Sequence, residues 1–265
     1  MFATRFLNRL ASRDFSRAQR VLTTLAGDAR TSTHGANARS TMGTSQLSEK
    51  RTIRGVVFDM DGTLCVSAAL DFTEMRRRVG CATADILGEV DSWDEARRTR
   101  AYEIIGDMER EALRTTTIMP GALDVAATLD DIGVPRALVT RNAASSVDFF
   151  HAEVWKLAPF SPWLSREFKP YKPAPDSLLH ICERWGCAPS EIIMVGDSAK
   201  DDVVSGNRAG AVTVLLDSGR TRKWTEEFGV QNVPDEMVPH FVCSNMDELK
   251  MLLTESGHFE FVGRN

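Results

Sequence analysis

The chain lacks the features that define several protein classes. No apolar run approaches the roughly 20 residues of a membrane-spanning helix, so we expect a soluble protein. The five cysteines are scattered and include no Cys-x-x-Cys pair, which argues against a zinc site and a disulfide framework and fits a reducing compartment. The five histidines show no metal-binding spacing, and no internal repeat is present.

Charge is unevenly distributed along the sequence. The net charge is −5 overall, but residues 1–50 hold eight basic and three acidic residues, which leaves 24 basic and 34 acidic residues for the remainder. That remainder carries a net charge of −10. Nucleic-acid backbones are bound mainly through Lys and Arg, so nucleic acid is not expected as the main ligand.

The first fifty residues have the composition of a targeting segment. They are poor in acids and rich in Ser and Thr, and they place arginines about one helical turn apart, at Arg5, Arg9, Arg13, Arg17 and Arg20. This pattern is typical of an organelle transit peptide. We predict mitochondrial import, with a plastid address, or a basic tail on a cytoplasmic protein, as the alternatives.

From residue 53 onward, the sequence predicts an α/β fold. Short apolar segments with strand character alternate with amphipathic helical segments, and the strand-like segments are TIRGVVFD, VPRALVT, EIIMVGD, AVTVLL and HFVCS. Near-continuous apolar strands that alternate with helices imply a parallel sheet covered on both faces. We therefore predict a doubly wound, Rossmann-like core formed by residues 51–65 and 118–265.

One segment interrupts this alternation. Residues 66–117 contain no convincing strand, and their pattern is helical throughout. Because this segment follows the first core strand directly, it predicts a small helical cap domain inserted there. Hinges are expected near residues 63–67 and 117–121.

Polar residues follow the predicted strands at the edge where open parallel sheets bind ligands. Asp59 and Asp61 come after GVVF, Thr140 and Arg141 end the next strand, and Asp197 ends the third. Lys172 lies in the loop one helix before Asp197. Carboxylate oxygens are preferred Mg²⁺ ligands, so this edge predicts a Mg²⁺ site next to a bound phosphate.

The residue types also indicate a reaction. Asp59 and Asp61 would share a face of an extended chain, and Gly62 would allow a sharp turn after them. An ionised Asp59 could attack phosphorus and form an aspartyl-phosphate, while Asp61 could act as general acid and then as general base. Thr140 and Lys172 could hold phosphoryl oxygens.

Four motifs in this order resemble those of the haloacid dehalogenase superfamily. They are FDMDGTL, VTRN, KPAPD and VGDSAKDD, and the resemblance runs from Arg54 to about Asp217 and includes the C-terminal strand and helix. It implies that Asp59 is the nucleophile and a metal ligand, that Asp61 is the acid/base and offers its carbonyl to the metal, and that Asp197 is a metal ligand. It also implies phosphate contacts from Thr140 and Lys172.

The resemblance carries further expectations about function. The chain has an aspartate, Asp61, two residues after the nucleophile. In this respect it resembles the phosphatases and phosphomutases of the superfamily, whereas the dehalogenases lack this aspartate. The insert resembles the helical-cap subgroup of phosphoglycolate phosphatases and β-phosphoglucomutase, and the segment from Arg166 to Gly186 is similar to a poorly characterised eukaryotic branch. We therefore expect a Mg²⁺-dependent phosphatase acting on a small phosphorylated metabolite. A sugar phosphomutase, or a non-catalytic phosphate-binding protein, is the alternative.

Several residues keep more than one interpretation. Asp201 matches the spacing of the fourth motif and is expected near the metal or Lys172, whereas Asp202 would cap a helix or face solvent. Arg141 is expected to bind phosphate, and Asn142 could contact the substrate, although both could instead belong to a solvated loop.

Lys169 competes with Lys172 for the role of the cation that binds the phosphate. The arginines at 76–78 could bind a second anionic group of the substrate or form a solvated helix face. The sequence does not predict the oligomeric state.

Overall fold

The main sheet forms the centre of the molecule. The computed structural model describes residues 50–66, 71–218, 225 and 232–263, so the predicted transit segment lies almost wholly outside the described residues. Within them, the main sheet has six strands in the order β6-β5-β2-β7-β8-β9, with all neighbouring strands parallel. In that order the strands are Trp163–Leu164, Arg136–Val139, Gly55–Phe58, Ile192–Gly196, Val212–Leu216 and Phe241–Cys243.

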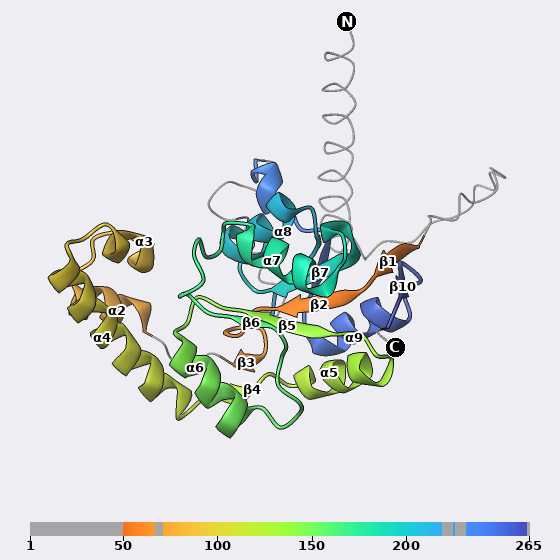
Figure 1. Cartoon of the computed structure of the whole chain (residues 1–265), viewed down its shortest axis with the longest axis horizontal. Helices are drawn as coiled ribbons and strands as arrows, with labels where there is room; N and C mark the ends of the chain where they lie inside the picture. Colours follow the sequence, from red (N-terminus) through yellow and green to blue (C-terminus); the bar gives the residue numbers. More distant parts are fainter. Residues whose placement is uncertain (1–49, 67–70, 219–224, 226–231, 264–265) are drawn as a thin grey trace, which may run out of the picture.

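Helices cover both faces of this sheet because successive strand residues point to opposite sides. In the central strand β2, Val56 and Phe58 belong to one hydrophobic cluster and Val57 to another. The first cluster includes residues of α5 (Ala122–Asp131), α6 (Ala144–Phe149) and α9 (Met246–Thr254). On the other face lie α7 (Asp176–Trp185) and α8 (Val204–Ala209), and Figure 1 shows the two layers. The predicted doubly wound α/β class is confirmed.

Three helices follow the first strand of the main sheet and stand apart from it (Figure 1). They are α2 (Phe72–Val79), α3 (Ile86–Asp91) and α4 (Glu95–Leu113), and aspartates at 71, 85 and 94 cap their N-termini. These helices have a separate small hydrophobic core. This is the predicted helical cap; its predicted limits of 66–117 stay a prediction.

A short antiparallel pair joins the cap to the core. Strand β3 (Cys65–Val66) pairs with β4 (Thr117–Ile118), so the chain leaves and re-enters the core at adjacent positions. The two predicted hinge regions therefore lie side by side wherever the structure describes them. Their pairing would let the cap move as one unit.

The sequence reading of the first strand was wrong in one respect. Residues 52–59 were expected to form a single strand, but the chain forms β1 (Arg51–Ile53) and β2, separated at Arg54. The two strands belong to different sheets. Strand β1 pairs with the C-terminal strand β10 (Phe259–Phe261), whereas β2 pairs with β5 and β7. Neither β10 nor β6 was predicted, since both are very short.

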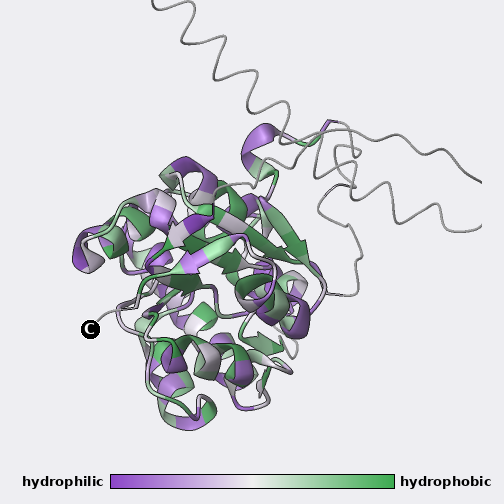
Figure 2. Cartoon of the chain, turned by 90° about the vertical axis from the view of Figure 1, so that its right-hand side faces the viewer, coloured by the Kyte–Doolittle hydropathy of each residue, from purple (hydrophilic) through white to green (hydrophobic). Residues whose placement is uncertain are grey.

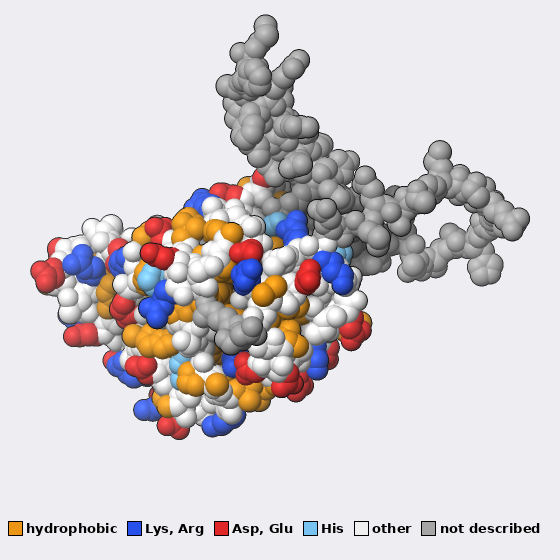
Figure 3. All heavy atoms as spheres, turned by 45° about the vertical axis from the view of Figure 1, so that its right-hand side comes forward, with side chains coloured by type: hydrophobic (Ala, Val, Ile, Leu, Met, Phe, Trp, Pro, Cys, Tyr) orange, Lys and Arg blue, Asp and Glu red, His pale blue; other side chains and the backbone are white. Residues whose placement is uncertain are grey.

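The distribution of polarity fits this arrangement. Hydrophobic residues concentrate on the strands and on the helix sides that face them (Figure 2). Basic and acidic side chains are interspersed over the described surface seen in Figure 3. In the part of the chain that the structure describes, no helix is both long enough and apolar enough to span a membrane.

Candidate active site

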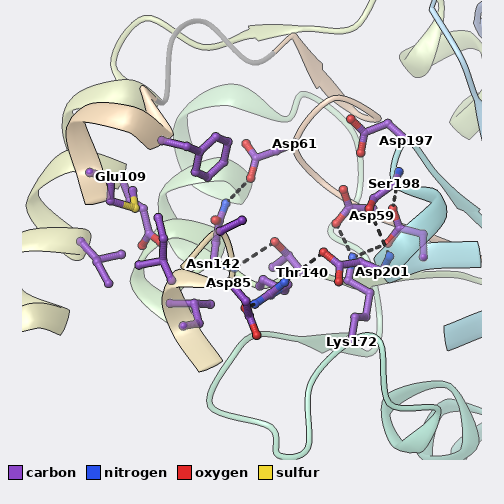
Figure 4. Close-up of a pocket in the computed structure, with 18 residues that line it drawn as sticks. Asp59, Asp61, Asp85, Glu109, Thr140, Asn142, Lys172, Asp197, Ser198 and Asp201 are labelled. Atoms are coloured by element: carbon purple, nitrogen blue, oxygen red, sulfur yellow. Dashed lines mark hydrogen bonds and ion pairs between the residues drawn. The ribbon is translucent and has the colours of Figure 1, made fainter. Parts of the chain in front are cut away.

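A cavity of about 330 Å³ lies between the carboxyl edge of the sheet and the cap. The strand ends bring together at this edge the residues predicted from the sequence, and Figure 4 shows them as sticks. All seven predicted site residues line the cavity: Asp59, Asp61, Thr140, Arg141, Lys172, Asp197 and Asp201. The structure therefore brings the predicted site together, whereas the chemical roles of its residues stay predictions.

Lys172 is a buried cation at the centre of the site. Its Nζ donates to Oδ1 of Asp59 at 2.5 Å and to Oδ1 of Asp202 at 2.6 Å, and the residue is only 2% exposed. Burial opposes the ammonium charge, but the two carboxylates outweigh it and raise the pKa of Lys172. Lys172 therefore stays charged, which holds Asp59 in a fixed position.

Lys169, the other candidate for the phosphate-binding cation, lies outside the site. Lys169 forms an ion pair with Asp91 of the cap and does not line the cavity formed by the described residues. Of the two lysines weighed from the sequence, Lys172 thus has the geometry expected of the phosphate-binding cation.

The fourth motif supplies Lys172 with an acidic partner, Asp202. Asp201 was expected near the metal or Lys172, but its carboxylate pairs with Arg141 at 3.0 Å. Asp202, expected to cap a helix or face solvent, is instead buried against Lys172 and also accepts from the Ser198 backbone N–H. Asp202 rather than Asp201 thus lies beside Lys172, and a place for Asp201 near the metal stays a prediction.

Local backbone geometry explains this difference. Residues Ala199–Val203 form a π-helical turn, which winds Asp202 inward rather than Asp201. The inward position also depends on Gly196, where a Cβ would lie 2.2 Å from the Asp202 carboxyl carbon. A glycine directly before Asp197 was the available sequence signal, because it marks a close approach to the backbone.

Three carboxylates converge where a cation could bind. Oxygens of Asp59, Asp197 and Asp202 lie within 4.8 Å of one another, and Lys172 pairs with Asp59 and Asp202. Burial and the charges of Asp59 and Asp202 raise the pKa of Asp197. Because one ammonium leaves this cluster with excess negative charge, the donor set fits a divalent, oxygen-preferring ion such as Mg²⁺. Asp59 and Asp197 would hold it, since both carboxylate oxygens of Asp202 already accept hydrogen bonds, from Lys172 and from the Ser198 backbone N–H.

Asp61 occupies a separate part of the cavity. Its Oδ2 accepts from Nδ2 of Asn142 at 2.5 Å, and Figure 4 shows this side chain apart from the Lys172 cluster. Burial raises the pKa of Asp61, Asn142 opposes that rise, and the negative charge of Glu109 adds to it. A carboxyl group with a raised pKa suits proton donation to a leaving oxygen.

Thr140 and Arg141 begin the loop after β5. The buried Oγ1 of Thr140 accepts from the Asn142 backbone N–H at 3.1 Å, which fixes the position of the hydroxyl at the end of the strand. Arg141 reaches across to the cap, where it pairs with Asp85 at 2.6 Å while also holding Asp201. Arg141 therefore connects core and cap.

Glu109 of the cap helix α4 was not found by the sequence analysis. It is buried, lines the cavity, and pairs with Arg166, which follows β6. Burial raises the pKa of Glu109, and the Arg166 charge opposes that rise. Nothing in the sequence singled out this residue, because a lone glutamate in a helix does not reveal which side of the cap faces the core.

The arginines at 76–78 do not reach the cavity. They lie at the end of α2, where Arg77 and Arg78 pair with Glu74 and remain largely exposed. Of the described residues, the set that lines the cavity includes none of the three. Of the two interpretations, the structure supports the solvated helix face.

The chain belongs to the haloacid dehalogenase-like hydrolase family, whose model matches residues 53–210. It is 42% identical over 216 residues to a haloacid dehalogenase-like hydrolase domain-containing protein of Arabidopsis thaliana, covering 77% of this chain and 85% of that protein. It is also similar to hexitol phosphatase A of Escherichia coli, at 28% identity over 181 residues, 62% of this chain and 83% of that one.

Solved structures share the fold. A predicted phosphoglycolate phosphatase from Haemophilus somnus matches with a TM-score of 0.56 at 21% identity, covering 76% of this chain and 98% of that one. The family model and the relative from Arabidopsis thaliana confirm the family expected from the four motifs, and with it the expectation that the chain is a hydrolase of this type.

Proposed function

We propose that this protein is a Mg²⁺-dependent phosphatase that hydrolyses a small phosphomonoester through an aspartyl-phosphate on Asp59. The observation that carries the proposal is the buried arrangement of Asp59 between Lys172 and Asp197, at the base of a capped cavity. The name of the similar hexitol phosphatase agrees with phosphoester hydrolysis. A cavity of about 330 Å³ suits a metabolite.

Each residue has a defined task in this reaction. Asp59, held by Lys172, attacks phosphorus and displaces the leaving oxygen, which takes its proton from Asp61. The Asp61 carboxylate, still held by Asn142, then accepts a proton from the water that releases phosphate. Thr140 and Lys172 bind phosphoryl oxygens, and Mg²⁺ held by Asp59 and Asp197 would neutralise phosphoryl charge.

The cap would exclude bulk water from this site. Asp85 and Asp91 join it to the core through Arg141 and Lys169, and Tyr171 donates to Asp91 at 3.1 Å. These contacts and the buried pair of Glu109 with Arg166 hold the cap over the site, so the ion pairs must separate when the cap opens for the substrate and re-form when it closes.

Phosphate release tests the proposal directly. A panel of phosphorylated metabolites is incubated with the protein, with Mg²⁺ or with EDTA, and free phosphate is measured. Release that depends on Mg²⁺ is expected from at least one ester. Isomerisation of a sugar phosphate without free phosphate would identify a phosphomutase instead.

Replacing Gly62 by alanine is expected to weaken Mg²⁺ activation. Gly62 has a φ of 72°, and a Cβ there would lie 2.1 Å from Oδ2 of Asp197, so Asp197 must move. The matched control is Gly186→Ala, with a φ of 66° and no atom within 4 Å of the added Cβ. Both variants lose about 1–2 kcal/mol of stability from the backbone strain.

Only Gly62→Ala should also lose activity, by at least about tenfold, and require more Mg²⁺ for half-maximal rate. Urea unfolding and a Mg²⁺ titration of the rate measure the two effects. Equal Mg²⁺ dependence in the two variants would contradict the place given to Asp197.

The pH profile should report on Asp61. The general acid must be protonated, so kcat falls as pH rises through the pKa of Asp61, which burial raises above its ordinary value. The Glu109 charge contributes to that rise, so Glu109→Gln should lower the pKa of Asp61. The fall of kcat on the basic side of the pH profile, its basic limb, should then move to lower pH. The control is Glu103→Gln, an exposed residue of the same helix, which should leave the limb in place. A limb unmoved by Glu109→Gln would argue against Asp61 as the acid.

We also propose that residues 1–50 direct the protein to mitochondria. The support is compositional, from the arginine spacing and the scarcity of acids. Deletion of residues 1–45 should leave kcat/KM unchanged and abolish import of a fluorescent fusion. A large loss of activity would show instead that the segment takes part in the folded enzyme.

A further inference from the structure

The cap side of the cavity is apolar and acidic. Its apolar lining consists of Phe72, Met75, Ala84, Ile86, Leu87 and Ile105. Among the described residues that line the cavity, the cap contributes two charged ones, Asp85 and Glu109, and both are acids. The part of the substrate that extends toward the cap is the leaving group, because the reacting phosphorus must lie at Asp59.

Glu109 brings a negative charge to the cavity. The residue lines the cavity, whereas its partner Arg166 is not among the described lining residues, and Ser146 donates to its carboxylate at 3.4 Å. Its charge contributes to the raised pKa of Asp61, which lines the same cavity. The residue is 4% exposed, so its charge acts in a poorly screened environment.

The described cations of the cavity are already neutralised. Lys172 pairs with Asp59 and Asp202. The two terminal nitrogens of Arg141 are held by Asp85 and Asp201, so an anion that approached Arg141 would meet two carboxylates as well.

We propose that the substrate is a phosphomonoester with an uncharged, hydroxyl-bearing leaving group, and that Glu109 and Asp85 select against a second anion. This proposal rests on the proposed function, since it names the substrate class of the same site. A hydroxyl group can donate to the Glu109 carboxylate, whereas a carboxylate or second phosphate would be buried beside it without a partner. An ammonium group is less suitable, because Glu109 and Asp85 are already paired with arginines and the rest of the cap lining is apolar.

Matched pairs of esters test the proposal. Hydroxyethyl phosphate and phosphoglycolate differ only in a hydroxymethyl group against a carboxylate, as do glycerol phosphate and phosphoglycerate. Each ester is measured as a substrate and as an inhibitor of p-nitrophenyl phosphate hydrolysis. The hydroxyl member of each pair should be favoured at least about tenfold in kcat/KM or in inhibition constant. Phosphoethanolamine should be poorer than hydroxyethyl phosphate.

Two variants assign this selectivity to the cap acids. Glu109→Gln should reduce the preference about tenfold, while Glu103→Gln on the same helix should not change it. If Glu109→Gln fails to fold, Asp85→Asn serves instead, because asparagine keeps the helix cap and removes the charge; it should shift the ratio in the same direction.

The outcomes are distinct. Equal or greater preference for the carboxylate member in the unmodified protein, preference for phosphoethanolamine, or a ratio that neither variant alters would overturn the proposal. Failure of the proposed function would appear differently, as p-nitrophenyl phosphate hydrolysis that requires neither Mg²⁺ nor Asp59.

Discussion

Replacing Asp59 by asparagine is expected to lower kcat by at least about 10⁴-fold, because the amide cannot attack phosphorus. The side chain keeps its size, and one amide oxygen can still accept from Lys172, so the fold should be retained. Phosphate release under saturating substrate measures the first effect, and circular dichroism with thermal unfolding measures the second.

The matched control is Asp131→Asn, at the exposed end of α5 and not among the described residues that line the cavity. It makes the same chemical change and should leave kcat within about twofold, as for surface substitutions in general. Retention of most activity in Asp59→Asn would remove Asp59 as the nucleophile and with it the aspartyl-phosphate.

Replacing Lys172 by methionine is expected to affect both stability and activity. The substitution leaves the carboxylates of Asp59 and Asp202 buried without their cation, and breaking a buried ion pair costs about 3–5 kcal/mol of unfolding free energy. Loss of a phosphate-binding charge should also lower kcat/KM by about 10²–10³-fold. Urea unfolding and steady-state kinetics provide the two measurements.

Lys169→Met is the natural comparison for this variant. Its ammonium also pairs with an aspartate, Asp91, but its side chain is 52% exposed, so its loss should cost less than about 1 kcal/mol. Added Mg²⁺ should restore part of the stability of Lys172→Met, because a bound cation compensates the same carboxylates. Similar unfolding free energies for the two variants, or no effect of Mg²⁺, would contradict the buried charge cluster.

The sequence predicted the fold and the sheet side of the site because both depend on local patterns. Apolar strands end in Asp59, Thr140 and Asp197, and parallel strands bring such ends to one edge. These strand-end inferences need only the direction of each strand and the residue that follows it. Lys172 follows no strand, and the resemblance of KPAPD to a family motif favoured it over Lys169; the structure places its ammonium against Asp59.

The cap side could not be predicted in the same way. Glu109 and Asp85 reach the cavity only because three helices pack on one another and onto the core, which no spacing along the chain reveals. The position of Asp202, rather than Asp201, beside Lys172 could not be predicted for a different reason. A π-helical turn changes the residue that points inward by one position, and helical periodicity cannot anticipate it.

The central claim is that a phosphoryl group passes through Asp59, and acid-quench mass spectrometry tests it most directly. The protein is mixed with a turned-over ester and Mg²⁺, quenched in acid within milliseconds, digested and analysed. We predict one added phosphoryl group on the peptide that contains Asp59, absent with EDTA and absent in Asp59→Asn. Rapid phosphate release with an unmodified Asp59 peptide at every quench time would contradict the account.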